Sequence, residues 1–161
     1  MDYGEIALGL FIAVLVFSAG CTQYFSNLTA PKSTLPLDQP AEFDSNGQQF
    51  TVTIDHIAMS SPSPDSHTMT VHLTARNTGK NTFSLVAYPR LSDTAGNEYA
   101  GNAVYLYSLF PGGMASGEST ISIGPKDAYA ALKNGATLEV RLQGGAGSVW
   151  EAGWDVDKGT L

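Results

Sequence analysis

From residue 49 onward, the sequence repeatedly alternates apolar and polar side chains. The first such run is QFTVTIDHIAM, residues 49–59, in which one side is formed by Phe50, Val52, Ile54 and His56. Comparable runs occupy residues 67–75 and 136–143. Since successive side chains of a strand point to opposite faces of a sheet, each run predicts a strand with one face in a core and the other in water.

Turn-forming residues divide the rest of this region into further short segments. Four more strands are predicted at residues 82–91, 98–107, 118–124 and 149–156. The segment Pro125 to Asn134 predicts a short helix, because a proline begins it, alanines fill it and Gly135 follows it. About seven antiparallel strands with one helix predict an all-β, immunoglobulin-like β-sandwich over residues 42–161.

The N-terminal segment has a different composition. Residues 6–20 form an apolar run without a charged side chain, and the next charge along the chain is Lys32. This run predicts an N-terminal apolar helix within residues 1–21, acting either as an export signal or as a membrane anchor. Both alternatives place the β domain in the cell envelope, on the outer face of the cytoplasmic membrane.

Cys21 ends the apolar segment. Ser18, Ala19 and Gly20 precede it, and this arrangement resembles the lipobox of lipoproteins, in which small residues precede a lipidated cysteine. The resemblance implies lipidation of Cys21. Two alternatives stay open, an uncleaved transmembrane helix and a pilin-like subunit of a surface filament.

Residues 22–41 are predicted to form a linker between the membrane and the domain. The segment contains Pro31, Pro36 and Pro40 and has no sustained periodicity, which is typical of a semi-rigid, extended tether. Asn27 begins the pattern Asn-Leu-Thr, which predicts a glycosylation site in an exported protein.

Charge and motifs exclude several classes of function. The net charge is −7, and the eight Lys and Arg residues are scattered along the chain, so nucleic acid is not predicted as a partner. The sequence lacks the Gly-x-Ser-x-Gly and His-Glu-x-x-His motifs and any phosphate-binding glycine-rich loop. We therefore predict a protein that is not an enzyme and that needs no cofactor.

One group of residues has the composition of a metal site. All three histidines and two of the four methionines lie within residues 56–72, namely His56, Met59, His67, Met69 and His72. Imidazole and thioether groups together favour copper. Strand alternation predicts His67 and Met69 on one face and His72 on the other, with His56 facing the core and Met59 facing away from it. The copper alternative therefore uses His67 with Met59 or Met69.

Two further sets of residues suggest binding sites. Asp93, Asn97 and Glu98 include oxygen ligands that calcium uses, but their spacing is typical of a hairpin turn. The aromatic residues that would form a recognition face are Tyr99, Tyr105, Tyr107, Phe110, Trp150 and Trp154. Alternation in residues 149–156 instead predicts that both tryptophans face the core.

The order of turns and strands, and the residues that form them, resemble a known family. The residues that carry the resemblance are Asn77 to Phe83, Leu91 to Tyr99 and Gly113 to Ile123. They resemble the telokin-like, immunoglobulin-fold domain of unknown function found in prokaryotic secreted lipoproteins, archaeal ones included, over residues 42–157. The resemblance implies an extracytoplasmic module without catalytic residues. Our leading hypothesis is a membrane-anchored binding or structural module whose partner is an envelope protein or a glycan.

Overall fold

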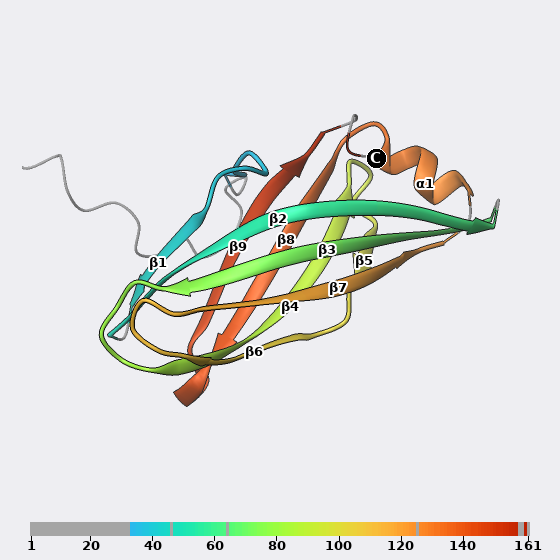
Figure 1. Cartoon of the computed structure of the whole chain (residues 1–161). Coiled ribbons are helices and arrows are strands. Elements are labelled where there is room, and N and C mark those ends of the chain that lie inside the picture. Colours follow the sequence, from blue (N-terminus) through green and yellow to red (C-terminus); the bar gives the residue numbers. More distant parts are fainter. Residues whose placement is uncertain (1–32, 46, 64, 125, 158–159, 161) are drawn as a thin grey trace, which may run out of the picture. The chain divides into compact units, whose positions relative to one another are not determined.

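A computed structural model describes residues 33–45, 47–63, 65–124, 126–157 and 160 (Figure 1). The predicted apolar helix, Cys21, Asn27 and the first part of the predicted linker lie outside the described residues. Within the described residues, no helix combines the length and apolar character needed to cross a membrane.

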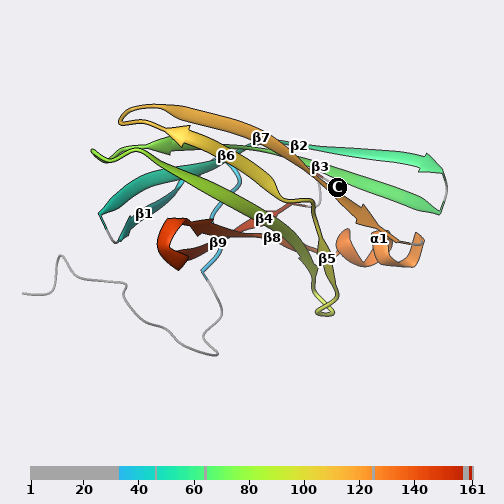
Figure 2. The ribbon, with the colours of Figure 1, turned by 90° about the horizontal axis from the view of Figure 1, so that it is seen from below.

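The described residues form two antiparallel sheets and one short α-helix. The first sheet has the strand order β1 (Ala41–Ser45), β2 (Gln48–Ser63), β3 (Ser66–Asn77) and β7 (Met114–Ile123). The second has the order β5 (Glu98–Ala100), β4 (Phe83–Asp93), β8 (Ala136–Gly144) and β9 (Val149–Val156), and β6 (Val104–Leu109) also pairs with β4. Figure 2 shows β2 and β3 in one layer and β8 and β9 in the other.

The all-β sandwich is thus confirmed, with two more strands than the alternation predicted. The helix is confirmed as α1 (Lys126–Leu132), which connects β7 to β8, and a short 3-10 helix at Gly145–Gly147 precedes β9. Alternate residues of each strand enter a single apolar core between the sheets. The largest fully buried side chains include Trp154, Phe50, Met69, Leu73 and Leu85.

A β-bulge in β2 overturns one prediction. Ile54 pairs with Leu73 and His56 pairs with His72, so that Asp55 is an extra residue with no partner in the register. Asp55 and His56 are both exposed. The prediction that His56 faces the core is therefore wrong, because an inserted residue moves the following side chains to the opposite face.

The same bulge moves Met59. Beyond it, Ile57 is buried and Met59 packs against the core, directly opposite Met69 in the pairing of β2 with β3. The prediction that Met59 points away from the core is thus wrong for the same reason. His67 and Met69 are buried and His72 is on the outer face, as predicted.

The predicted linker ends earlier than residue 41. Leu35 pairs with β9, since its N–H donates to the carbonyl of Gly153 at 2.9 Å and its carbonyl accepts from Asp155 at 2.8 Å. Trp154 Nε1 donates to the carbonyl of Gln39 at 2.8 Å, and Leu37 packs against the core. Residues 35–39 therefore belong to the folded unit, because their backbone and apolar side chains complete its edge.

The strand predicted at residues 98–107 is interrupted. Gly101 donates to the carbonyl of Pro89 on β4 at 2.9 Å and also bridges to Ile121 on β7, so the chain passes between the two sheets there. A Cβ at this position would lie 2.4 Å from Ser119 Oγ, which explains why a glycine occupies it. The chain then returns to β4 as β6.

Candidate functional site

Exposed tyrosines gather on the outer face of the second sheet. Tyr105 and Tyr107 on β6 are 57% and 66% exposed, and Tyr88 on β4 is 40% exposed. The rings of Tyr105 and Tyr107 stack with their centroids 5.8 Å apart and their planes at 14°. Because Tyr105 pairs with Val86, two residues before Tyr88, all three side chains point to the same face. We call Tyr88, Tyr105 and Tyr107 the tyrosine face.

An ion-pair network lies beside the tyrosine face. Arg90 Nη1 is 3.0 Å from Glu98 Oε2, and its Nη2 hydrogen bonds to Glu139 and lies 3.8 Å from Glu151 Oε1. The hydrogen bond to Glu139 raises the pKa of Arg90 above its usual value, while partial burial acts in the opposite direction. Together these groups put one fixed positive charge among three carboxylates.

An open groove of about 440 Å³ connects the two features. Its lining includes Tyr88, Arg90, Glu139, Arg141, Val149 and Glu151. In the register of the sheet, Tyr88 lies opposite Arg141, which in turn lies opposite Glu151. The groove therefore offers an aromatic ring and several hydrogen-bonding groups on a rigid sheet.

The other aromatic residues of the predicted recognition face divide between the surface and the core. Phe110, at the start of the turn between β6 and β7, is 61% exposed, whereas Tyr99 is half-buried against the core. Trp154 is fully buried, and Trp150 packs edge-on against Phe50 with its Nε1 donating to Ser45 Oγ at 2.8 Å. The prediction that both tryptophans face the core is confirmed.

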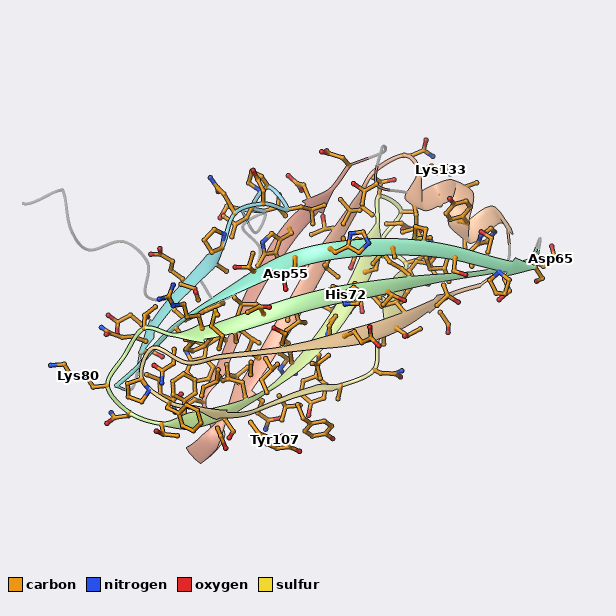
Figure 3. All side chains as sticks on the ribbon, viewed as in Figure 1. Asp55, Asp65, His72, Lys80, Tyr107 and Lys133 are labelled. Atoms are coloured by element: carbon orange, nitrogen blue, oxygen red, sulfur yellow. The ribbon has the colours of Figure 1, made fainter. Side chains whose placement is uncertain are left out.

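The outer face of the first sheet brings together a second set of side chains, the histidine row. His56, His72 and Glu118 are consecutive cross-strand partners on β2, β3 and β7. The two imidazole centroids are 5.8 Å apart, and His72 Nδ1 lies 3.5 Å from Glu118 Oε2. Asp55 lies beside this row and accepts a hydrogen bond from Thr74 Oγ1 at 2.6 Å. Figure 3 shows Asp55 and His72 over the first sheet and Tyr107 at the β6 edge.

The row lines a shallow depression of about 500 Å³, to which Asp55 also contributes. As the side chains stand, no three His, Cys, Asp or Glu residues in the described part of the chain are grouped closely enough to hold a metal ion. The predicted five-residue cluster of histidines and methionines is therefore divided by the sheet into an outer pair, His56 and His72, and an inner group.

The inner group lies where the β2–β3 hairpin meets α1. The imidazole of His67 stacks on Tyr129 with centroids 4.0 Å apart, and its Nδ1 is 2.8 Å from Ser61 Oγ. The buried Nε2 of His67 has no hydrogen-bond partner among the described residues. Met59 and Met69 form a cross-strand pair on the same face of this hairpin.

The turn at Asp93 forms a closed hydrogen-bonded unit. Asp93 Oδ1 accepts from the backbone N–H groups of Ala95 and Asn97 at 2.9 and 2.8 Å, and Oδ2 accepts from Asn97 Nδ2 at 2.7 Å. These bonds, that of the Asn97 side chain foremost, lower the pKa of Asp93 below its usual value. The carboxylate is thus used within the turn, which confirms hairpin chemistry at this position.

Sequence reasoning missed Tyr88 and the histidine row. Tyr88 joins the tyrosine face only because β6 pairs with β4, a contact that the local pattern does not specify. The histidine row depends on the bulge at Asp55. Its signal in the sequence is a change of phase, because the apolar residues move from even positions up to Ile54 to odd positions from Ile57, with two polar residues between them.

Comparison with known proteins supports the fold alone. No protein-family model matches the chain, and no curated protein is significantly similar to it. Among solved structures, a putative β-galactosidase from Bacteroides fragilis matches with 17% identity and a TM-score of 0.50, over 66% of this chain and only 16% of that chain. The putative ApaA protein from Bordetella pertussis matches with 16% identity and a TM-score of 0.42, over 68% of this chain and 94% of that one. The first of these similarities is consistent with the two-sheet fold.

Proposed function

We propose that this chain is a membrane-anchored, extracytoplasmic binding module that is not catalytic and whose tyrosine face binds a glycan. The observation that carries the proposal is the exposed stack of Tyr105 and Tyr107, on the same face as Tyr88, which lines the groove together with Arg90. Three large rings exposed together on one face indicate a binding surface, because covering exposed aromatic side chains with a ligand contributes favourable free energy to binding.

The charges favour a glycan over a protein partner. The cores of protein interfaces are depleted in charged residues, whereas Arg90, Glu139 and Glu151 line the groove next to Tyr88. A sugar has apolar ring faces for stacking and hydroxyl groups that bond to carboxylates and guanidinium groups. The chain carries a net charge of −7, so the expected ligand is neutral rather than anionic.

The strand connectivity supports an immunoglobulin-type sandwich, which is part of the proposal. The sheets β2-β3-β7 and β5-β4-β8-β9 follow the A-B-E and C′-C-F-G order of that fold, with β1 and β6 as additional strands. We also propose that the chain belongs to the telokin-like lipoprotein family, on the basis of the resemblance of its turn residues. Such domains carry their binding surfaces on a rigid scaffold, as proposed for the tyrosine face.

A glycan array followed by calorimetry with the best ligand tests the binding proposal. Tyr105→Ala and Tyr107→Ala are each expected to weaken binding roughly tenfold, since one lost stacking contact costs about 1.4 kcal/mol. Phe110→Ala is the matched control, because Phe110 is equally exposed but lies outside the tyrosine face. An array without any ligand, or affinity unchanged in both tyrosine variants, contradicts the proposal.

The anchoring part of the proposal places Cys21 at the new N-terminus, carrying lipid, in the outer leaflet of the cytoplasmic membrane. Two acyl chains anchor a protein stably, since each buried CH₂ contributes about 0.8 kcal/mol. The intact mass of protein purified from membranes tests it: a species that begins at Cys21 with added lipid is expected. A full-length species means an uncleaved helix, and assembly into filaments would favour the pilin-like alternative.

A copper-carrying function is the second candidate, favoured by the geometry around His67. Its buried Nε2 has no hydrogen-bond partner in the described part of the chain, and Met59 and Met69 face each other on the same side of the hairpin. Thioether and imidazole ligands favour Cu(I). Titration with Cu(I) against a competing chelator tests this, with Met59→Leu and Met69→Leu as volume-conserving variants. Equal affinity in both variants and in His67→Ala would rule it out.

A further inference from the structure

The histidine row groups side chains of the types that bind metal ions, and the proposed function does not use them. His56, His72 and Glu118 stand side by side on three adjacent strands, and their side chains all leave the same face. Neighbouring strands are about 4.8 Å apart, so the central His72 lies within side-chain reach of both flanking residues. The row also lines the depression of about 500 Å³ on this face.

The β-bulge is what assembles the row. In a regular ladder without the bulge, Asp55 would pair with His72, and His56 would pair with Val71 on the core face. With the bulge, Asp55 and His56 both reach the outer face. Bulges are over-represented next to functional sites, where they redirect a side chain at some cost to the sheet.

The distances in the row are close to those of ligands that share one ion. Two ligand atoms bound tetrahedrally at about 2.0 Å from a zinc ion lie about 3.3 Å apart, and the centroids of two imidazoles bound in this way lie about 5 Å apart. His72 Nδ1 and Glu118 Oε2 are 3.5 Å apart, and the centroids of His56 and His72 are 5.8 Å apart.

A metal ion bound at the row would require its three side chains to rotate toward one point. In the structure the three side chains do not yet converge on a single point. Glu118 is 64% exposed at its side chain and His72 is 42% exposed, so both can change rotamer without disturbing the core. The backbone positions, set by the sheet, need not move.

We propose that His56, His72 and Glu118 bind a divalent transition-metal ion, for which Zn²⁺ is the representative. Two imidazoles and one carboxylate form a nitrogen and oxygen ligand set that suits Zn²⁺, whereas the absence of sulfur from the row separates it from a Cu(I) site. Three protein ligands leave a fourth position open, which is the pattern of sites that exchange a ligand.

Asp55 supports the ion from beside the row. Its carboxylate is held by the hydroxyl of Thr74 at 2.6 Å, and Thr74 Oγ1 is also 2.6 Å from Ser116 Oγ, so its position is fixed by two neighbouring strands. With neutral imidazoles, the charges of Glu118 and Asp55 balance those of a divalent cation. Such carboxylates, held by hydrogen bonds, tune metal sites from outside the ligand shell.

Imidazole NMR of the full-length, ¹⁵N-labelled protein in detergent, titrated with Zn²⁺ alone, tests this inference. The chain has only three histidines, so each ring is followed separately. The ring signals of His56 and His72 are expected to shift together and to saturate, while those of His67 stay in place. Movement of His67 alone, or no saturable shift up to millimolar Zn²⁺, would overturn the proposal.

Calorimetry on single variants provides the second readout. His56→Gln and His72→Gln are each expected to weaken Zn²⁺ binding at least tenfold, and Glu118→Gln several-fold. Thr70→Ala is the matched control, because Thr70 lies two residues from His72 on the same face of β3 and contributes no ligand. Circular dichroism establishes that each variant is folded. Affinity unchanged in both folded histidine variants would refute the site.

Discussion

Asn77 is fully buried, and its hydrogen bonds join two turns, the one between β3 and β4 and the one between β6 and β7. Its Nδ2 donates to the carbonyls of Asn81 and Leu109, both at 2.8 Å, and its Oδ1 accepts from the N–H of Gly79 at 2.8 Å. Its backbone also exchanges hydrogen bonds with the turn between β6 and β7, which follows the tyrosine face along the chain. Replacing this side chain therefore tests whether local turn chemistry or the core sets the stability of this end of the sandwich.

Asn77→Ala is expected to lower the free energy of unfolding by about 3 kcal/mol. Each of the three hydrogen bonds contributes about 1 kcal/mol net, and a buried partner left without a bond adds to the loss. A change of this size shifts the melting temperature by roughly 10 °C in a domain of this length. Urea unfolding, followed by tryptophan fluorescence, measures it.

Asn77→Asp is expected to cost more than the alanine variant at neutral pH. It keeps the acceptor for Gly79, but it turns a carboxylate oxygen toward the carbonyls of Asn81 and Leu109 in a buried site. Asn81→Ala is the control, since the Asn81 side chain is exposed and its Nδ2 donates a long hydrogen bond of 3.3 Å to the carbonyl of Gly47. A loss below about 1 kcal/mol in Asn77→Ala, or an aspartate variant as stable as wild type, would refute this reasoning.

Three other substitutions test the packing and the turn. Gly117→Val is expected to destabilise by about 1 to 3 kcal/mol in urea unfolding, because a Cβ at this position would lie 2.4 Å from Val104 Cγ1; wild-type stability would contradict the close approach. Trp154→Phe removes the hydrogen bond to Gln39 and is expected to increase hydrogen exchange in residues 33–40 before the rest of the domain; uniform exchange would contradict this. For Asp93, the folded-state pKa is lowered, so its stabilisation is present above the unfolded value near 3.8 and is lost as the pH falls through the folded value. The melting temperature of Asp93→Asn should therefore fall less on acidification than that of the wild type. An equal decrease of melting temperature with pH in the two proteins would count against this.

The local pattern predicted the parts of the fold that depend on the chain alone. Alternation placed Phe50, Val52 and Ile54 in the core, and it did the same for Trp154. The Pro125 to Asn134 signal found α1 within a few residues of its bounds. These features follow from the two-residue period of a strand and from the start and stop residues of a helix, which are properties of neighbouring residues.

The candidate sites depended on pairings between distant segments. Tyr88 joins Tyr105 because β6 returns to β4 after the passage at Gly101. Residues 35–39 join the domain because β9 offers them a free edge and Trp154 a hydrogen bond. The prolines and polar residues of the predicted linker gave no indication that residues 35–39 would contact β9 or Trp154.

The alternating runs determined by themselves that this chain folds as an all-β domain with one buried face on each strand. Only the tertiary structure decided which side chains share the outer faces, and the bulge at Asp55 is the clearest case. It reverses the phase of His56 and Met59, and it brings His56 to His72 and Glu118. The physical reason is that a strand's register is fixed by its hydrogen-bonded partner on another strand, so one inserted residue moves every later side chain to the other face.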